Sequence, residues 1–438
     1  MTTDKLMRNL FRFVVLTTFM AARSLPAAAT ERGQLWAAVA KVDITPSDLT
    51  GLTNLWGTQF EGVRDKIYVR ALVLDNSKTK TAVIVADLVE FGDTTAVRRR
   101  IAQEVGIPAD NIFITATHDY SAPRAGKVSP GGTARAGGTA TASYSAYVDE
   151  RILDAVREAK AKLQPAKVGV GTGYADVNVN REVLTSQGWR IGPNPDGPSD
   201  KTVWVVKFET MADEPIAFFV NYAVRSVVMG PENKLLTGDL AGATSRFIEQ
   251  HFDDKVVALL TTGSVGDQNP KFITWDYTFT KKTVEPGFSL VDTQGQILAE
   301  EALRTADHIE HEHSDIQLMA AQRIVTCSPN TKPNPNRPAQ VLVPPSAQVD
   351  ILLGLLMIDK TALASVSGEV VTKIYWRLKK ESPFTNTIVM SLVNDRIGYL
   401  ADDAAYDTPY FELSGTPVAK NCAETGIVNG MLDMMNQF

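Results

Sequence analysis

The chain alternates between short apolar runs and longer amphipathic segments, and this alternation restricts its possible folds more than any other feature. The apolar runs are rich in Val, Ile and Phe, end at turn residues, and predict buried β-strands. They fall at residues 66–74, 81–91, 111–117, 202–208, 215–220, 255–261 and 387–393. Helical patterns lie between many of them, at 95–105, 145–163, 240–251 and 294–306. The sequence therefore predicts an α/β fold, with a mixed β-sheet core and flanking helices.

The amino-terminal segment has the pattern of an export signal. Basic residues precede an apolar run at 13–22, which is followed by three alanines at 27–29. Such a run is shorter than the roughly 20 residues that span a bilayer, and it ends in small residues typical of a cleavage site. We expect residues 1–29 to be a signal peptide cleaved near Ala29, and residues 30–438 to form one catalytic domain. We expect a secreted or periplasmic protein without a transmembrane segment.

Composition limits the partners of the chain. The formal net charge of −6 over 438 residues, without a basic stripe, is not typical of a nucleic-acid-binding protein. The only cysteines, Cys327 and Cys422, lack the C-x-x-C spacing of a redox or zinc motif. Cys327 and Cys422 either form a disulfide or remain as two free thiols, and the sequence leaves both alternatives open. A small-molecule, lipid-like or saccharide substrate is the expected partner, and the sequence leaves the oligomeric state open.

Unusual polar residues follow four of the predicted strands. In open α/β sheets, sites gather beyond the carboxyl ends of strands, where the backbone leaves the ladder and side chains converge. The four runs are Thr117-His118-Asp119-Tyr120-Ser121-Ala122-Pro123, Asn221-Tyr222-Ala223-Val224-Arg225, Gly263-Ser264-Val265-Gly266-Asp267-Gln268-Asn269-Pro270 and Asn394-Asp395-Arg396-Ile397-Gly398-Tyr399. These runs are the candidate site.

The ordered set of motifs identifies a family resemblance. Three further pieces occur in the same order, Gly238-Asp239, Gly368-Glu369 and Glu381-Ser382-Pro383-Phe384. Together with the four runs, they resemble the catalytic domain of the neutral, non-lysosomal ceramidases and their shorter bacterial relatives. The resemblance extends from about Ala38 to about Met435. It implies that family's α/β catalytic fold.

The resemblance also implies a zinc site. In that family, two histidines, a glutamate and a tyrosine hold a zinc ion that activates water to attack the amide carbonyl of an N-acyl sphingoid. Zinc suits this reaction because it lowers the pKa of bound water to about 7 and polarises carbonyl groups. Three ligand positions match His118, Glu369 and Tyr399. Zinc is therefore a possible cofactor, held by these three residues if it is bound.

Three positions depart from the family pattern. Arg225 stands where the second ligand histidine would be, and Tyr120 stands at the second histidine of the T-H-T-H-S motif, which handles protons in the family. In the early G-V-H-D motif the histidine is replaced by Arg64. Arginine stays protonated and offers no lone pair to a metal, so the fourth ligand position becomes cationic.

Arg225 has three possible roles. It can pair with Glu369 in a bidentate geometry and fill the metal position, hold a substrate carboxylate, or tie two loops together as a structural residue. His118 and Tyr120 are two apart in an expected extended segment, which would direct both side chains into one pocket. The candidate catalytic residues are His118, Tyr120, Arg225 and Tyr399, and the candidate substrate-binding residues are Arg64, Asn221 and Asn394.

Two reactions fit these residues, and in a third interpretation the protein catalyses no reaction. The first is hydrolysis of an amide in an N-acylated, ceramide-like substrate, with water activated by zinc or by a His118 or Glu369 base, and the oxyanion stabilised by Arg225 or Tyr120. The second is metal-free β-elimination on a uronate-containing polysaccharide, in which Arg225 neutralises the acid, and His118, Tyr120 and Tyr399 transfer protons. The third is an inactive member that only binds its ligand.

A separate histidine cluster follows the predicted helix 294–306. His308, His311 and His313 have a spacing that suggests a metal site, but acidic residues surround them. We interpret them as the solvated end of that helix.

Overall fold

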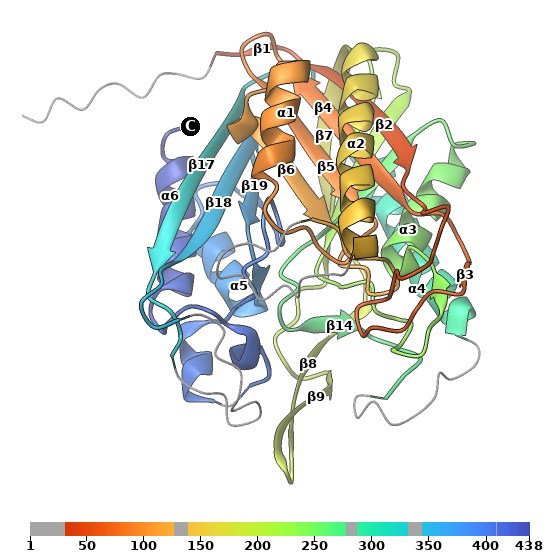
Figure 1. Ribbon diagram of the computed structural model, residues 1–438. Coiled ribbons are helices and arrows are strands. Elements are labelled where there is room, and N and C mark those ends of the chain that lie inside the picture. Colours follow the sequence, from red (N-terminus) through yellow and green to blue (C-terminus); the bar gives the residue numbers. More distant parts are fainter. Residues whose placement is uncertain (1–30, 127–138, 277–286, 332–343, 409) are drawn as a thin grey trace, which may run out of the picture.

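The computed structural model describes residues 31–126, 139–276, 287–331, 344–408 and 410–438. The signal peptide expected at residues 1–29 lies outside the described part of the chain. Figure 1 shows strands in the interior and helices around them.

A large mixed sheet forms the center of the fold. Its strands run in the order β13-β11-β10-β7-β2-β4-β5-β6, and β15 pairs with β7 beside this path. Only the pairs β11–β13 and β5–β6 are parallel. The bounds are β2 (Trp36–Asp43), β4 (Tyr68–Asp75), β5 (Lys80–Ala86), β6 (Ile112–Ala116), β7 (Gln164–Tyr174), β10 (Thr202–Thr210), β11 (Pro215–Tyr222), β13 (Val257–Thr262) and β15 (Glu312–His313).

A second sheet comes from the carboxyl-terminal third of the chain. Its order is β17-β18-β19-β21, with antiparallel pairs except between β19 and β21. The bounds are β17 (Leu318–Cys327), β18 (Val349–Ile358), β19 (Thr361–Val366) and β21 (Asn386–Met390). A disulfide between Cys327 and Cys422 links the end of β17 to the start of the last helix.

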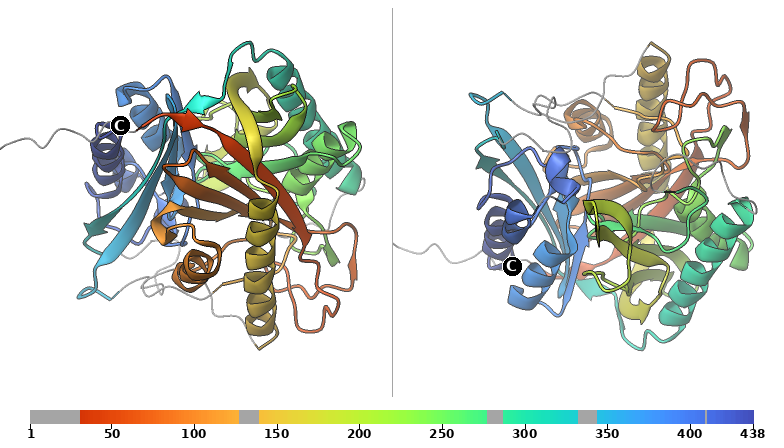
Figure 2. Two further views of the ribbon diagram at one scale, coloured as in Figure 1. Left: turned by 90° about the horizontal axis from the view of Figure 1, so that it is seen from above. Right: turned by 90° about the horizontal axis from the view of Figure 1, so that it is seen from below.

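The two sheets pack face to face. Their shared core contains Val85 and Phe113 from the large sheet, and Leu356 and Ile388 from the second sheet, all fully or almost fully buried. Burial of such a side chain contributes about 1.5–3 kcal/mol. The two views in Figure 2 show this pairing of sheets from above and below.

Helices cover the outer face of each sheet. α1 and α2 pack on β2, β4, β5 and β6, and α3 and α4 pack beside β10, β11 and β13. α5 and α6 cover the outside of the second sheet. The result is a four-layer α/β/β/α arrangement (Figure 2). The bounds are α1 (Thr95–Val105), α2 (Thr139–Ala161), α3 (Asp239–His251), α4 (Gly287–Asp307), α5 (Thr372–Glu381) and α6 (Ala423–Met435).

Four small sheets complete the fold. β14 pairs with the β8–β9 hairpin, which projects from the body in Figure 1, and β20 pairs with β22 in parallel. The bounds are β1 (Gly33–Gln34) with β16 (Asp315–Ile316), β3 (Gly62–Val63) with β12 (Leu235–Leu236), β8 (Asn178–Thr185), β9 (Gly188–Asn194) and β14 (Gln268–Pro270), and β20 (Glu369–Val370) with β22 (Tyr399–Leu400). Three short 3₁₀ turns span Ala109–Asn111, Asp403–Asp407 and Glu412–Gly415.

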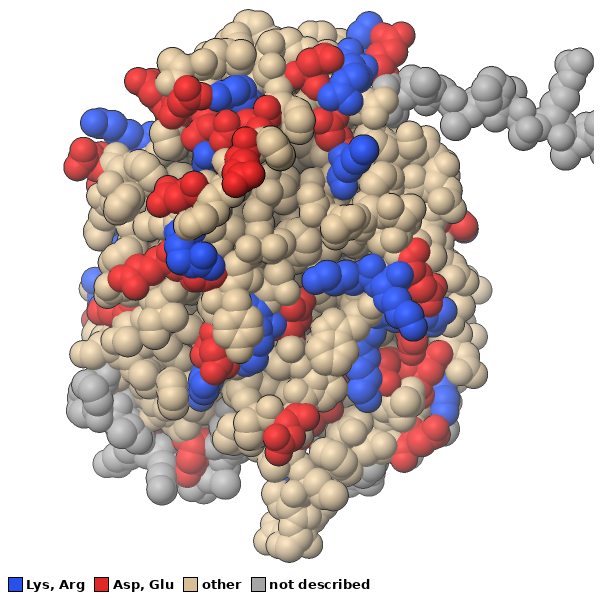
Figure 3. All heavy atoms as spheres, turned by 180° about the vertical axis from the view of Figure 1, so that it is seen from behind, with Lys and Arg blue, Asp and Glu red and all other residues tan. Residues whose placement is uncertain are grey.

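The surface shows no single dominant charge on the face seen in Figure 3. Basic and acidic side chains are interspersed there. No helix in the described ranges combines the length and the apolar character needed to cross a bilayer.

Candidate functional site

The segments that follow β6, β11, β13 and β21 meet at one edge of the packed sheets. Asp119 bridges Ser226 in parallel, and the amide of Tyr120 donates to the carbonyl of Ser226 over 2.9 Å. The amide of Gly266 donates to Val370 over 2.9 Å. These backbone bonds bring together polar residues that are far apart in the sequence.

Glu369 lies at the center of this edge and is completely buried. Its Oε2 atom accepts a hydrogen bond from Nη2 of Arg225 at 2.7 Å and lies 3.2 Å from Nε2 of His118. Its Oε1 atom accepts a hydrogen bond from Nη2 of Arg396 at 3.0 Å. Burial alone would raise the pKa of Glu369, but the positive charges of His118, Arg396 and Arg181 outweigh it and lower that pKa to about 2. Glu369 is therefore a carboxylate at neutral pH.

The ring of His118 is held between two oxygen acceptors. Its Nδ1 atom lies 2.9 Å from the carbonyl oxygen of Val89, and its Nε2 atom faces Glu369. The hydroxyl of Tyr120 is 3.4 Å from Nε2, and the two rings meet edge to face with centroids 5.0 Å apart. A hydrogen on Nδ1 satisfies the carbonyl of Val89, and a hydrogen on Nε2 satisfies the carboxylate of Glu369.

The backbone at His118 is not extended. Its φ angle is 55°, in the left-handed region, so the argument from two-residue alternation does not explain why it meets Tyr120. A turn after β6 does so instead. Leu392 and Asn394, which follow β21, also have positive φ angles of 62° and 66°. Backbone strain of this kind concentrates at functional sites.

Arg225 is completely buried and binds mainly through one nitrogen. Its Nη2 atom donates to Glu369 and also to the carbonyl oxygens of Val265 at 2.7 Å and Gly266 at 3.1 Å. Arg225 therefore pairs with Glu369, as one of its three possible roles predicted, but the pair is not bidentate. The Nε and Nη1 atoms are buried and have no hydrogen-bond partner among the described residues. Buried donors of this kind are costly unless an acceptor reaches them.

Tyr399 lies between two guanidinium groups. The central carbon of Arg181 is 5.1 Å from its ring centroid, and that of Arg225 is 5.8 Å away. Burial raises the pKa of Tyr399, although the charge of Arg181 opposes this shift. Removal of water from around the phenol raises the pKa of Tyr120 well above its usual value, with smaller effects from Tyr399 and Glu369. Both tyrosines therefore carry their protons at neutral pH.

A second row of charges surrounds this cluster. Nε of Arg396 lies 2.7 Å from Glu90, which also approaches Arg124 at 3.6 Å. On the other side, Nε of Arg181 donates to Glu412 at 2.8 Å. Sequence analysis gave no role to these residues. The position of Glu90 after β5, and of Arg396 within the run before Tyr399, were signals that could have found them.

The family model described as "Neutral/alkaline non-lysosomal ceramidase, N-terminal" matches residues 39–323. The chain belongs to the neutral/alkaline non-lysosomal ceramidase family. Family membership supports a hydrolase.

Two solved structures share the fold of this ceramidase-family chain. The neutral ceramidase from Pseudomonas aeruginosa matches with a TM-score of 0.73 at 15% identity, over 92% of this chain and 74% of that one. A structure described as a ceramidase complexed with C2 matches with a TM-score of 0.69 at 14% identity, over 92% and 75%. No curated protein gives a significant match.

The residues present do not fit the zinc ion that the family implies. Both oxygens of Glu369 already accept hydrogen bonds from guanidinium groups, and Arg225 places a permanent charge against the same carboxylate. A dication bound by His118, Glu369 and Tyr399 would face Arg181, Arg225 and Arg396 at contact range, which electrostatic repulsion opposes.

One carboxylate cluster elsewhere has metal-like spacing. Among the described residues, Glu209, Asp213 and Glu312 place their oxygens within 4.8 Å of one another. Lys207 pairs with Glu209 at 3.0 Å and with Glu312 at 2.8 Å, while Lys167 pairs with Asp213. Each of the three carboxylates therefore already has a lysine partner.

The three candidate substrate-binding residues have structural partners. Arg64 pairs with the largely buried Asp65 and with the half-exposed Asp292 of α4. The amide of Asn221 donates to Thr261 and to the carbonyl of Val389, so it ties β11 to β13 and β21.

Asn394 connects the second sheet to β6. Its side chain accepts from the amide of Ile114 at 2.8 Å and donates to the carbonyl of Ile112 at 2.9 Å. The side-chain amide of Asn394 and the side-chain nitrogen of Asn221 thus hydrogen-bond to neighbouring strands. These contacts give no support to a role of either residue in substrate binding.

Proposed function

We propose that this protein is an exported, metal-independent hydrolase that cleaves an amide bond in an N-acylated, ceramide-like substrate. Family membership supports hydrolysis, and the composition of the site supports a mechanism without zinc. The reacting groups are His118, Glu369 and Arg225, with Tyr120 and Tyr399 beside them. Arg225 replaces the metal as the fixed positive charge of the site.

The single observation that carries the proposal is the pair of unsatisfied donors on Arg225. Nε and Nη1 are buried without an acceptor, although the same guanidinium is fixed in place through Nη2. A substrate carbonyl oxygen would satisfy them, and the negative charge that develops on it during attack would strengthen the interaction. Preorganised donors of this type stabilise the transition state of acyl transfer by several kcal/mol, about 3 kcal/mol for one donor.

His118 and Glu369 provide the water-activating pair. With its Nδ1 hydrogen held by Val89, His118 directs Nε2 at Oε2 of Glu369, 3.2 Å away. The carboxylate of Glu369 accepts a proton from the attacking water, while His118 donates its Nε2 proton to the leaving nitrogen as the C–N bond breaks. The proton on Glu369 then returns to His118.

Substrate reaches the cluster from the side of Tyr120. His118, Arg225 and Glu369 are at most 1% exposed, whereas Tyr120 keeps some contact with solvent. The ring of Trp56 meets Tyr120 edge to face at 5.2 Å and continues the apolar wall. Tyr120 therefore forms the entrance, and its side chain moves when an acyl chain enters.

Elemental analysis together with an activity assay tests the proposal. Wild-type protein purified without chelator should contain no stoichiometric zinc and should hydrolyse a fluorescent N-acylsphingosine equally well with and without a chelator. Arg225→Met should retain the fold and lose activity by about 100-fold or more. Arg225→His restores the ligand type at the fourth position and should gain stoichiometric zinc. Wild-type protein that carries zinc and loses activity on chelation would contradict the proposal.

β-Elimination is the second candidate, and the charge of the cluster favours it. Arg181, Arg225 and Arg396 all contact the site, and the two neighbouring phenols remain protonated. A uronate carboxylate could take the free donors of Arg225 in place of a carbonyl oxygen. Ultraviolet absorbance of a new carbon–carbon double bond in oligouronate products distinguishes this reaction from hydrolysis. Binding without product in both assays would indicate an inactive binding member.

Export is also part of the proposal. The pairing of Cys327 with Cys422 suits an oxidising compartment such as the periplasm or the extracellular medium. Amino-terminal sequencing of protein recovered outside the cytoplasm should begin near Thr30. Recovery of the uncleaved chain inside the cell would contradict export.

A further inference from the structure

A cavity of about 450 Å³ opens between the two sheets, at the opposite end from the His118 cluster. The two ends of β21 lie at these two places. Asn386, at the start of β21, lines the cavity, and the chain that follows its last residue, Met390, leads to the His118 cluster. The apolar floor consists of Val168 and Val170 from β7 and Ile358 from β18. The cavity is an open cleft at the edge of the core between the two sheets.

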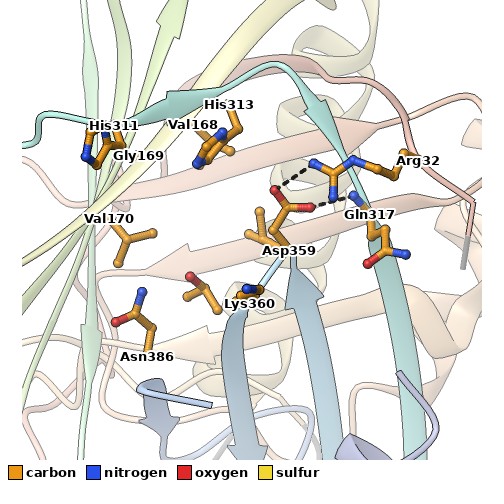
Figure 4. A pocket seen from close by; sticks show the side chains of 12 residues that line it. Arg32, Val168, Gly169, Val170, His311, His313, Gln317, Asp359, Lys360 and Asn386 are labelled. Carbon is orange, nitrogen blue, oxygen red and sulfur yellow. Dashed lines mark hydrogen bonds and ion pairs between the residues drawn. The ribbon is translucent and has the colours of Figure 1, made fainter.

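Basic side chains form the rim of this cavity. His311 and His313 both line it, while Glu312 between them points away and pairs with Lys207 at 2.8 Å. Strand alternation explains this arrangement, because β15 pairs with β7 and residues 311 and 313 share a face. The interpretation as a solvated helix end holds for His308, which directly follows α4 and contacts the carbonyl of Arg304. It does not hold for His311 and His313, because they lie beyond the helix and His313 belongs to a strand. Figure 4 shows both rings on the cavity side.

Lys360 and Arg32 complete the rim, and they differ in their partners. The ammonium group of Lys360 makes no hydrogen bond or ion pair with any residue in the described ranges, and the same holds for the imidazoles of His311 and His313. Arg32 pairs with Asp359 at 3.3 Å.

Asp359 is the one acidic residue in the cavity lining. One of its oxygens accepts from Arg32 and the other accepts from the amide of Gln317 at 2.7 Å (Figure 4). Its charge is thus compensated locally, and three basic groups remain for a ligand.

We infer that this cavity binds an amphiphilic anion, with the apolar body on Val168, Val170 and Ile358 and the charged head at Lys360, His311 and His313. The volume lies within the range of small-molecule sites, and an apolar floor with a few polar groups is their usual composition. A carboxylate or phosphate head matches the basic rim, and a medium-length alkyl chain matches the floor. The site lies apart from the His118 cluster, so it does not depend on the proposed hydrolysis.

Calorimetric titration of the full chain with decanoate, below its micelle concentration, tests this inference. Decanoate should bind about 15-fold more tightly than octanoate, because each of its two additional methylenes contributes about fourfold in affinity when buried. Decyl phosphate should bind as well, and the ratio of the two affinities shows whether the rim prefers a carboxylate or a phosphate. Acetate and the uncharged 1-decanol should each bind at least about tenfold more weakly than decanoate.

Two variants separate the charge of the rim from the apolar floor. Lys360→Glu reverses a charge in an exposed turn and should weaken decanoate binding about tenfold or more, whereas Lys380→Glu makes the same change on exposed α5 and should have no effect. Val170→Phe fills the floor and should abolish the advantage of decanoate over octanoate. Equal binding of decanoate and 1-decanol, or unchanged decanoate affinity in both Lys360→Glu and Val170→Phe, would overturn the inference.

Discussion

Arg225 and Glu369 are 144 residues apart in the sequence, yet Nη2 of the arginine lies 2.7 Å from Oε2 of the glutamate. Both side chains are completely buried. In the family that the motifs indicate, these positions would hold two ligands of a zinc ion. Here an ion pair joins them directly, and His118 and Arg396 contact the same carboxylate.

Loss of Arg225 should destabilise the fold. Arg225→Met leaves Glu369 buried with fewer partners, and removal of one member of a buried pair typically costs about 3–5 kcal/mol. We expect the lower end, because His118 and Arg396 still contact the carboxylate. Urea unfolding gives the free energy directly. Arg100→Met, which breaks an exposed pair with Glu150, should leave the free energy of unfolding almost unchanged.

The double variant Arg225→Met/Glu369→Gln tests whether the two residues are coupled. Removal of both charges should cost less than the sum of the single variants, by about 0.5–3 kcal/mol. Strict additivity of the two free-energy changes would show that the 2.7 Å contact contributes nothing to stability.

Stability should depend on the charge of Glu369 at acid pH. The pKa of Glu369 is lowered from 4.5 to about 2 in the folded state, so its ionised form stabilises the fold above pH 4.5. This contribution, about 3 kcal/mol for such a shift, is lost as the pH falls from 4.5 towards 2. The difference in unfolding free energy between wild type and Glu369→Gln should therefore be constant above about pH 5 and shrink steadily below it.

A surface carboxylate provides the control for this pH dependence. Glu150 is half exposed, and Glu150→Gln should give a small difference at every pH. A wild-type minus Glu369→Gln difference that does not change between pH 7 and pH 3 would show that Glu369 is not held as a carboxylate by its neighbours.

The phenol groups at the entrance should affect catalysis more than stability. Tyr120→Phe keeps the ring that packs on Trp56 but removes the hydroxyl near His118. We expect kcat to fall about 10- to 100-fold, with a stability change below about 1 kcal/mol. Tyr147→Phe makes the same change on α2, away from the site, and should leave kcat unaltered. An increase in KM alone, with kcat unchanged, would assign Tyr120 to binding only.

The disulfide should contribute strongly to stability. Cys327 and Cys422 are 95 residues apart, and closure of a loop of this length in the unfolded chain is worth about 4 kcal/mol. The variant with both cysteines replaced by alanine should melt at a clearly lower temperature than the wild type. A reducing agent should lower the wild-type melting temperature towards that of the variant and leave the variant unchanged. Equal melting temperatures in all four samples would contradict this.

Some elements could be read from the sequence because their signals are local. The helix at 95–105 has the bounds of α1, and the strand expected at 111–117 contains β6. The strand expected at 81–91 continues past the end of β5 at Ala86. The apolar residues that follow Ala86 are not part of the sheet, and the carbonyl of Val89 among them contacts His118. Apolar character alone therefore does not mark where a strand ends.

Other elements had weak local signals. β7 contains Gly169, Gly171 and Gly173, which weaken a strand pattern, and large side chains from α4 and the following turn occupy the space beside them. The division into two sheets was also beyond sequence analysis, because strand pairing depends on partners such as β19 and β21 that are separated by α5.

The sequence by itself determined which chemical groups are available: an imidazole at 118, a guanidinium at 225, a carboxylate at 369 and a phenol at 399, in the order of a known family. Only the tertiary structure decided which of them touch. In the folded protein the backbone of His118 lies in the left-handed region. Both oxygens of Glu369 accept hydrogen bonds from arginines, and Arg181 and Arg396 belong to the cluster. The physical reason is that residue type is a local property, whereas the electrostatic balance of a buried site depends on groups that only the packing of distant segments brings within a few ångströms.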